Sequence, residues 1–493
     1  MPACFLTMNR ILLYLLLLAT CFTACKKGTL LDNVPPDTKI SISSINLVGD
    51  DRLRSEVELN WLGFDSDGYV TGYELSIDGG LTWNYTTETD SLFQFELSVG
   101  QDTLDIDFQV RAIDDKEEVD PTPATLTVPI KNTPPTAVFD TTNVIPDTSH
   151  VITTIFLTVE DLDGESNLDS IYLRANNGAW LGLPPSTKIV TLVPVDPSVT
   201  GPVAMQVLVG ASASLQPTLL TGCVLEGDNQ LSLRARDIAG AESAVEDSKV
   251  FYIKRKTSDL VLVDAHAGGT SPTPEDVLFP AVAATYSNGF DHIDLRSNNG
   301  ANRPNLWNPT FSLYLNLYDK VMWYCDESLE GFSILEDASG AVQEFLNNDG
   351  KLFVTTGFPT TPTFKRTFNE SSVVREFSPI DSIWTRGGLA RLSDSSTVYP
   401  VPPFSADYDK LESAVFQGNT TPFYVKSTAD SMYNAVVIPT GGYAGPNIVC
   451  ARSQNNASNT NIVFMSLELY KLNGIPGSIE SFLNQVLNNE FNW

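Results

Sequence analysis

The sequence predicts a multidomain protein, with two all-β sandwiches followed by an α/β domain that has a mostly parallel sheet. The chain has 493 residues, enough for about three ordinary domains. Before residue 256, apolar and polar residues alternate in short runs, whereas later runs are apolar without interruption. Hydrophobic residues make up 42% of the chain and aromatic residues 10%, so there is enough apolar surface for several cores.

The charge and the scarcity of two residue types exclude several classes of protein. The 60 acidic residues outnumber the 30 basic ones and give a formal net charge of −30. Nucleic acid is therefore excluded as a partner, because the attraction to a phosphate backbone has the wrong sign. Six cysteines in this length exclude a disulfide scaffold, and three histidines leave little room for a histidine-rich metal centre.

The amino terminus has the features of a secretory signal. Arg10 precedes an apolar run of about ten residues at 11–20, which is too short to span a bilayer of about 20 residues. The small residues Thr23 and Ala24 then stand directly before Cys25. This arrangement resembles the lipobox of bacterial lipoproteins, including those of Bacteroidetes-type bacteria.

The lipobox resemblance implies an exported protein that is anchored by lipid rather than spanning the membrane. Residues 1–24 would be removed, Cys25 would carry lipid such as palmitate, and residues 25–32 would form a linker. Loss of Arg10 would make the net charge −31. The expected location is the outer membrane or cell surface, with the orientation left open. The alternative is an ordinary cleaved signal with a chance cysteine.

Three other cysteines remain after the signal, namely Cys223, Cys325 and Cys450. An odd number allows at most one bridge within the chain. Cys325 and Cys450 are the only pair inside one predicted domain, and the sequence leaves open whether they pair. Such sparing use of cysteine is compatible with an exported protein stabilised by core packing.

Residues 33–256 contain a diverged repeat whose copies are 33–132 and 133–256. Four short motifs occur in the same order in both copies, which is stronger evidence than any single match. Their alternating strands, broken by turn residues, predict a β-sandwich in each copy. The paired motifs are residues 33–36 with 132–135, 59–61 and 65–68 with 157–159 and 161–164, 79–83 with 177–180, and 108–114 with 231–237.

These repeats resemble fibronectin type III and immunoglobulin-like modules of bacterial surface proteins. The resemblance implies that Trp61 is the core aromatic residue of an early strand and that residues 110–114 belong to a late strand. It covers residues 33–132 and, more loosely, 133–256. The second copy departs from it at residues 184–222, a proline-containing insertion that is either a long loop or extra strands.

Each copy contains an Asp-x-Asp-Gly sequence that is a candidate calcium site. The candidate ligands are Asp65 and Asp67 in the first copy and Asp161 and Asp163 in the second, because calcium prefers carboxylate oxygens. In a sandwich, the acidic loop at 114–117 would share an end with the first pair. Neither loop has the EF-hand spacing, and the alternative is a turn in which Asp side chains bond the backbone. No other cofactor is suggested.

Residues 257–493 change to the pattern of an α/β domain. Unbroken apolar strands with helices between them predict a parallel sheet covered on both faces. The predicted strands are 260–263, 320–324, 351–357 and 461–465, and the predicted helices are 341–346 and 479–487.

The order of these elements resembles flavodoxin-like domains related to class I glutamine amidotransferases. In that family a nucleophilic cysteine follows the strand that corresponds to residues 352–354, but this chain has Thr355, Thr356 and Gly357 there. The family's later His-x-Glu pair is also missing, because no histidine follows His292. The glutaminase activity is therefore not expected.

Ligands of open α/β sheets bind beyond the carboxyl ends of the strands. This edge should collect six polar residues, and Cys325 and His266, with Asp264, would make a nucleophilic site if they lay within hydrogen-bond reach. The alternative is that Cys325 is a small buried residue and His266 a loop residue. The six residues are Asp264, His266, Cys325, Asp326, Glu327 and Thr355.

The sequence therefore suggests a lipid-anchored cell-envelope protein without catalytic activity. The sandwiches would present the α/β domain to an envelope protein or to a glycan, and contact with the membrane would be through lipid. The alternative is an exported hydrolase that uses a Cys/His cleft in the α/β domain.

Overall fold

The computed structural model describes residues 32–492 except 269, 270, 302, 308 and 456. The predicted signal at residues 1–24 and the predicted lipid attachment site Cys25 lie outside the described residues. The chain forms two compact units. The first ends at Thr133 and includes Leu162–Gly164, and the second holds residues 134–161 and everything from Glu165 on. None of the helices described has the length and apolar character needed to cross a membrane.

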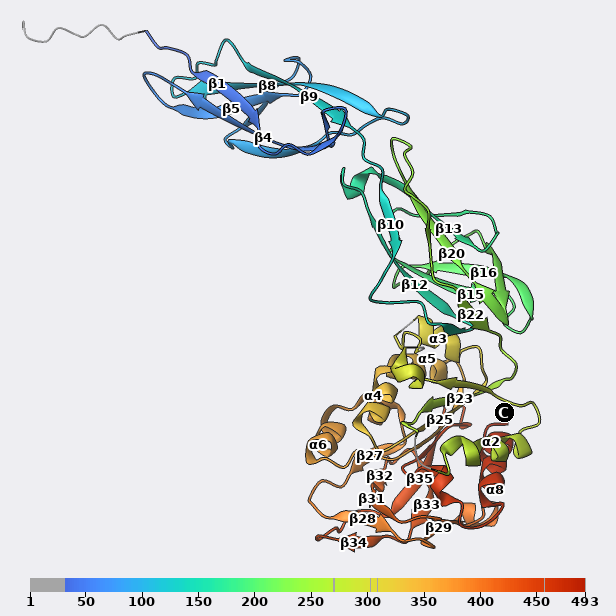
Figure 1. Ribbon diagram of the computed structural model, residues 1–493. Coiled ribbons are helices and arrows are strands. Elements are labelled where there is room, and N and C mark those ends of the chain that lie inside the picture. The colour runs from blue at the N-terminus through green and yellow to red at the C-terminus, as the bar shows by residue number, and fades with distance from the viewer. Residues whose placement is uncertain (1–31, 269–270, 302, 308, 456, 493) are drawn as a thin grey trace, which may run out of the picture. The chain divides into compact units, whose positions relative to one another are not determined.

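The first unit is a β-sandwich, as predicted (Figure 1). Its core contains Trp61, which is 3% exposed and whose ring centre lies 6.3–6.4 Å from those of Tyr73, Phe93 and Phe108. One sheet has the order β1 (Asp37–Ile42), β4 (Glu56–Phe64), β7 (Asp90–Gln94). The other has the order β2 (Leu47–Gly49), β3 (Arg52–Leu53), β9 (Ala124–Lys131), β8 (Thr103–Asp114), β5 (Val70–Ser76), β6 (Asn84–Thr86).

The second unit begins with another β-sandwich. The proline-containing insertion at 184–222 folds mainly as strands that extend one sheet, so it is not a long loop. That sheet contains β10 (Thr136–Phe139), β12 (Thr153–Glu160), β15 (Ile189–Pro194), β16 (Gly201–Val209), β17 (Ser214–Leu215) and β18 (Leu220–Leu225). Facing it are β14 (Leu181–Leu183), β13 (Leu168–Ala175), β20 (Leu231–Asp237) and β21 (Glu246–Asp247), with a smaller sheet of β11 (Thr148–His150), β22 (Phe251–Lys254) and β19 (Gly227–Asn229).

The rest of the second unit is built on a mixed sheet rather than the mostly parallel one predicted. Its parallel part has the order β24 (Asp291–Asp294), β23 (Leu260–Ala265), β25 (Lys320–Cys325), β26 (Lys351–Thr356), β36 (Thr460–Met465). Antiparallel strands continue it as β35 (Ile448–Gln454), β33 (Asp430–Ala435), β29 (Thr397–Pro400) and β30 (Leu411–Glu412). The antiparallel strands escaped prediction because most of them are short and polar.

Helices cover both faces of this sheet (Figure 1). Alternate residues of β23 face opposite cores, with Val261 and Val263 in one and Leu260 and Leu262 in the other. The first core is covered by α3 (Thr310–Leu315), α4 (Leu329–Asp337), α5 (Ser339–Asn347), α6 (Pro362–Ser371) and α7 (Val373–Phe377). The second is covered by α2 (Pro274–Thr285) and α8 (Ser478–Asn484), which continues as a π-helical segment, Gln485–Glu490.

The second sandwich packs directly on the α/β part. Val151 and Ile152 of the sandwich belong to the same core as α3. The hydroxyls of Thr154 and Thr310 lie 2.7 Å apart.

The two small sheets lie outside the mixed sheet. One pairs β27 (Ile380–Ile383) with β32 (Phe423–Val425), and the other contains β31 (Gln417–Thr420), β28 (Leu389–Leu392) and β34 (Ile438–Thr440).

The role of Trp61 in the first sandwich gives a stability prediction. Trp61→Ala should lower the free energy of unfolding by about 3–5 kcal/mol, because it removes a buried indole surrounded by aromatic rings. Leu62→Ala, at the neighbouring position that is 66% exposed, should change it by no more than about 0.5 kcal/mol. Urea unfolding followed by far-ultraviolet circular dichroism measures both, and equal effects would contradict the assignment of Trp61 to the core.

Candidate functional site

The carboxyl ends of the parallel strands bring the predicted polar residues to one edge. Ala265 of β23 pairs in register with Cys325 of β25, which pairs in turn with Thr356 of β26. Asp264, His266, Asp326 and Thr355 therefore all lie at this edge, as expected from the parallel order.

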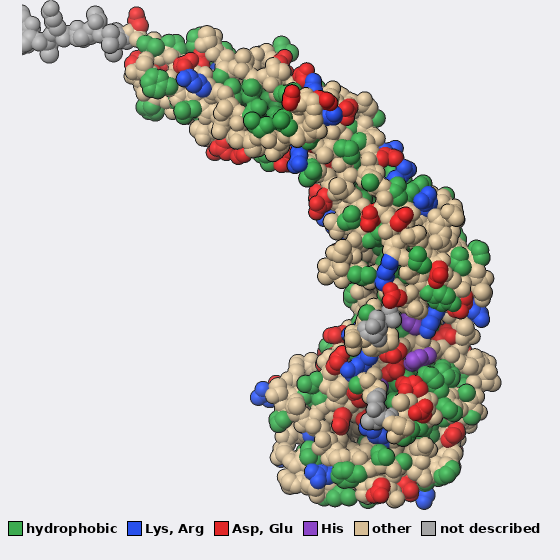
Figure 2. Space-filling model, viewed as in Figure 1, with side chains coloured by type: hydrophobic (Ala, Val, Ile, Leu, Met, Phe, Trp, Pro, Cys, Tyr) green, Lys and Arg blue, Asp and Glu red, His purple; other side chains and the backbone are tan. Residues whose placement is uncertain are grey.

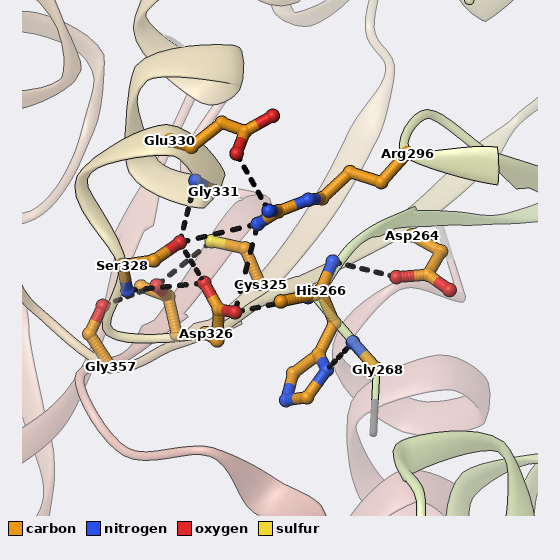
Figure 3. Close-up of polar contacts among 12 residues, drawn as sticks. Asp264, His266, Gly268, Arg296, Cys325, Asp326, Ser328, Glu330, Gly331 and Gly357 are labelled. Atoms are coloured by element: carbon orange, nitrogen blue, oxygen red, sulfur yellow. Dashed lines mark hydrogen bonds and ion pairs between the residues drawn. The ribbon is translucent and has the colours of Figure 1, made fainter. Parts of the chain in front are cut away.

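The Asp326 carboxylate forms hydrogen bonds with two loops at this edge, those that follow β23 and β25 (Figure 3). Its carboxylate accepts hydrogen bonds from the backbone N–H groups of Ala267 at 3.0 Å and Ser328 at 3.1 Å, and from the Ser328 hydroxyl. Arg296 lies 3.7 Å away and also pairs with Glu330 at 2.7 Å. Burial acts to raise the pKa of Asp326, but the Ser328 and Ala267 donors outweigh it and hold the pKa below its ordinary value.

Cys325 and His266 do not form the pair that a hydrolase of this kind would need. The Cys325 thiol is 1% exposed and donates to the Thr356 hydroxyl at 2.9 Å, and burial raises its pKa. Nδ1 of His266 accepts from the Gly268 N–H at 2.9 Å, so the ring points to Gly268 rather than to the sulfur (Figure 3). No hydrogen bond joins Cys325 and His266 in the part of the chain that the structure describes. The arrangement leaves the thiol protonated and without a base.

Nε2 of His266 is also engaged, on the side away from Gly268. It lies 3.4 Å from Oε2 of Glu468, which is 5% exposed, and 3.5 Å from the Tyr470 hydroxyl. Burial raises the pKa of the neighbouring Glu327, and the charge of Glu468 adds to this effect. His266 is thus part of the packing between β23 and the segment after β36.

Asp264 belongs to a second polar cluster at the same edge. Its Oδ1 accepts from the His266 N–H at 2.7 Å, and its Oδ2 lies 3.7 Å from Nε2 of His292. The Tyr324 hydroxyl lies 3.2 Å from the same His292 nitrogen and donates to Oε1 of Glu275 at 3.1 Å. Burial raises the pKa of Asp264. Asp264, His292, Tyr324 and Glu275 therefore form one connected polar cluster at this edge.

The carboxyl edge is also closed. The space among Cys325, His266, Thr355 and their neighbours is too small to admit even a water molecule. Sites for small-molecule ligands usually measure about 300–1,000 Å³. The predicted edge is therefore a packed junction and not an open cleft.

A more open groove lies at the opposite edge, near the amino ends of β26 and β36. It measures about 500 Å³. The amide side chains of Gln343 and Asn347 line it, and Oδ1 of Asn461, also in its lining, is buried without a hydrogen-bond partner in the described structure. Leu346, Asp349, Glu376, Phe377, Asn455 and Ala457 complete its lining.

Sequence reasoning did not find this groove. The apolar pattern predicts only a helix at 341–346 and a strand at 461–465, with no sign of a groove between them. The one available signal was the recurrence of amide residues at helix and strand ends, at Asn347, Asn455 and Asn461. That signal alone does not show which amides face one another.

The two candidate calcium loops differ from each other. Oδ1 of Asp65 accepts from the Asp67 N–H at 3.2 Å, and Oδ2 of Asp67 lies 3.5 Å from Nζ of Lys116. In the second copy, Asp163 is fully buried, and its carboxylate accepts from the backbone N–H groups of Ser55 at 2.9 Å and Thr133 at 2.5 Å. Asp161 is 8% exposed. Within the described residues no group of three or more His, Cys, Asp or Glu side chains is arranged to hold a metal.

The three described cysteines are free thiols. Cys223, Cys325 and Cys450 are all buried. Cys325 and Cys450 belong to the cores on opposite faces of the mixed sheet, so the only pairing that the sequence allowed within one domain is not formed.

In comparisons with known proteins, no family model matches the chain. No curated protein matches it either. Among solved structures, the fibronectin(III)-like modules of Clostridium thermocellum CbhA match at 13% identity with a TM-score of 0.17, over 44% of this chain and 94% of theirs. A two-domain fibronectin type III segment of chicken tenascin matches at 15% identity and 0.20, over 45% and 99%.

A cytoplasmic protein from Salmonella typhimurium LT2 matches at 11% identity with a TM-score of 0.31, over 47% of this chain and 98% of its own. At these TM-scores the likeness identifies neither the fold nor the function. The assignment of β-sandwiches rests on the sheets of the chain itself.

The network around Asp326 gives a pH-dependent prediction. A pKa lowered by folding means that ionised Asp326 stabilises the fold above its unfolded pKa, near 3.8, and that this stabilisation is lost as the pH falls below that value. Asp326→Asn should therefore destabilise the second unit by about 1–3 kcal/mol at pH 7 and by clearly less at pH 3.

Glu330→Gln is the matched control for Asp326→Asn. Glu330 also pairs with Arg296 but is 63% exposed, so the change should cost less than about 1 kcal/mol at either pH. Urea unfolding at the two pH values measures both variants. A cost for Asp326→Asn that does not change with pH would show that its charge is not the cause.

Proposed function

We propose that the chain is an exported, lipid-anchored envelope protein whose α/β part binds a neutral glycan in the groove at the amino ends of β26 and β36. The observation that supports this proposal is the set of amide side chains of Gln343, Asn347 and Asn461 that line the groove beside Phe377, with Oδ1 of Asn461 buried without a hydrogen-bond partner in the described structure. An amide both donates and accepts hydrogen bonds, as does each hydroxyl of a sugar. The half-buried Phe377 ring supplies an apolar surface for a sugar face.

The charge around the groove favours a neutral ligand over an anionic one. The exposed carboxylates of Asp349 and Glu376 line it. Helix α5 ends at Asn347, and the carboxyl end of a helix carries partial negative charge. A phosphate or a uronic acid would be repelled by all three, whereas a neutral oligosaccharide would not.

The closed carboxyl edge is the reason to prefer binding over the Cys–His hydrolase. The Cys325 thiol is buried and bonded to Thr356, and His266 is turned to Gly268. A nucleophile needs access to substrate and a base within reach. The geometry supplies neither for Cys325.

We also propose that the α/β part is flavodoxin-like and that the first sandwich is a fibronectin type III-like module. Numbered along the chain, the parallel strands have the order 2-1-3-4-5, which is that of flavodoxin-like sheets. The first sandwich pairs three strands against a larger sheet, which supports a fibronectin type III-like module. The sandwiches would act as spacers between the lipid at Cys25 and the binding domain.

Substitution of neighbouring asparagines tests the glycan groove. Asn347→Ala and Phe377→Ala should each weaken binding of a neutral oligosaccharide by about tenfold, because they remove a hydrogen bond or a stacking surface. Asn348→Ala should leave binding unchanged, since Asn348 bonds Asn316 and does not line the groove. A glycan array selects the ligand, and isothermal titration calorimetry measures the affinities. A chain that binds no glycan on the array, or equal affinities for the three variants, would contradict the proposal.

The lipid anchor is tested separately at Cys25. Cys25→Ser should abolish incorporation of an alkyne-labelled fatty acid and release the exported protein from the membrane fraction, because a serine cannot form the thioether. Cys223→Ser is the control and should retain the label, since Cys223 is buried in the second sandwich. Labelling that persists in Cys25→Ser would exclude this residue as the lipid attachment site.

A further inference from the structure

The outer face of one sheet in the first sandwich carries two aromatic side chains beside an ion pair. Tyr85 of β6 pairs in register with Glu74 of β5, which pairs in turn with Arg111 of β8. Residues directly opposite each other on neighbouring strands share a face of the sheet. Trp83 stands two residues before Tyr85, and the Arg111 guanidinium lies over its ring, 4.0 Å from the ring centre. We call these four side chains the Tyr85 platform.

The Tyr85 ring is held against its own sheet and still faces solvent. A Cβ atom on Gly72 would lie 2.5 Å from Cε2 and from the hydroxyl oxygen of Tyr85, so the ring packs where residue 72 has no side chain. The Tyr85 hydroxyl donates to the Thr71 carbonyl at 3.4 Å. Tyr85 is nevertheless 62% exposed. The ring is therefore an aromatic surface that is both held in place and accessible.

Glu74 and Arg111 neutralise each other beside this ring. Nε and Nη2 of Arg111 lie 2.6 Å and 2.5 Å from Oε2 of Glu74. The Arg111 side chain is 30% exposed and the Glu74 side chain 26% exposed, so a ligand on the face can reach both. A guanidinium donates hydrogen bonds and a carboxylate accepts them. The platform thus offers donors and acceptors next to an aromatic ring, with no net charge.

The second sandwich shows the same repeat position with its aromatic ring covered. Trp180 is the counterpart of Trp83 in the repeat. The guanidinium groups of Arg174 and Arg234 both lie over the Trp180 ring, 4.5 Å and 4.8 Å from its centre. A guanidinium stacked on an aromatic ring occupies the place that a ligand would take.

The tyrosine of the second sandwich is covered as well. The register that places Tyr85 opposite Glu74 in the first copy places Gly182 opposite Tyr172 in the second. Arg234 lies over the Tyr172 ring, 5.0 Å from its centre. The two copies have therefore diverged at this face, and the comparison predicts one open platform and not two.

We propose that the Tyr85 platform binds one pyranose ring of a neutral oligosaccharide. The C–H face of the sugar would stack on Tyr85, and its hydroxyls would bond Glu74 and Arg111. Because the ring already packs against Gly72, little side-chain freedom is lost on binding. A charged sugar would have to compete with the Glu74–Arg111 pair. This second site lies in a different unit of the chain from the groove, and it extends the proposed function without depending on that groove.

Calorimetry on the full mature chain, purified in detergent, tests the platform when the groove is disabled by Asn347→Ala with Phe377→Ala. The probes are cellohexaose, xylohexaose and mannohexaose, which are neutral chains of β-linked pyranoses. We expect at least one probe to bind. Tyr85→Ala in this background should weaken its binding by at least about tenfold, because the stacking surface is lost. Tyr85→Phe keeps the ring and should retain the affinity.

Two further variants separate a loss of stacking from a loss of structure. Tyr85→Leu keeps an apolar side chain over Gly72 but removes the aromatic face, so it should weaken binding as Tyr85→Ala does and tests the site even if Tyr85→Ala does not fold. Tyr69→Ala is the matched control, because Tyr69 is also exposed, at 66%, but precedes Glu74 by five residues. It should leave the affinity unchanged. Thermal unfolding shows which variants are folded.

Three results would overturn the platform proposal. The first is that none of the three probes binds the chain with the disabled groove, and the second is that the folded Tyr85 variants bind as tightly as their parent. The third is a dimer in sedimentation analysis that Tyr85→Leu dissociates, which would assign this face to a second copy of the chain. The groove is disabled in every calorimetric measurement, so failure of the platform leaves the proposed groove untouched.

Discussion

Burial of the parallel strands on both faces determines where polar groups of the α/β part can lie. Strand β23 is buried at every position, and Val261, Leu262 and Val263 are 0% exposed. An unpaired polar side chain in the middle of such a strand would cost several kcal/mol, so the polar residues gather at the strand ends. The acidic excess of the chain is accommodated on the surface, where acidic side chains are spread over the visible face with basic ones between them (Figure 2).

The polar groups at the two ends of these strands differ in their hydrogen bonding and in how tightly they are packed. At the carboxyl end, Asp326 accepts hydrogen bonds from the loops that follow β23 and β25, and the space beside them is filled. Cys325 faces the core covered by α3 to α7, because it alternates with Tyr324, which faces the other core. At the amino end, Oδ1 of Asn461 is buried without a hydrogen-bond partner among the described residues, and a groove remains. The usual expectation for α/β sheets, with ligands at the carboxyl end, is therefore reversed in the proposed function.

Sequence patterns predicted the features that depend on periodicity. The two sandwiches, the place of Trp61 in a core and the cover of the sheet on both faces follow from alternating or unbroken apolar runs. The antiparallel strands β29, β30 and β33 were missed because they are short and have polar residues among the apolar ones. The sequence also could not show which side chains and backbone groups from distant loops form hydrogen bonds with one another. Two copies of Asp-x-Asp-Gly look alike in sequence, yet Asp163 accepts from the N–H groups of Ser55 and Thr133 in distant loops, while Asp65 accepts from the Asp67 N–H within its own loop.

The central claim is that ligand binds at the amino edge of the sheet and not at the carboxyl edge. Hydrogen–deuterium exchange with and without a neutral oligosaccharide that binds the chain tests this claim most directly. We expect slower exchange in the backbone of residues 343–349 and 376–377, with no change at residues 264–268 and 325–328. Protection confined to the carboxyl-edge segments would contradict it and would return attention to Cys325 and His266.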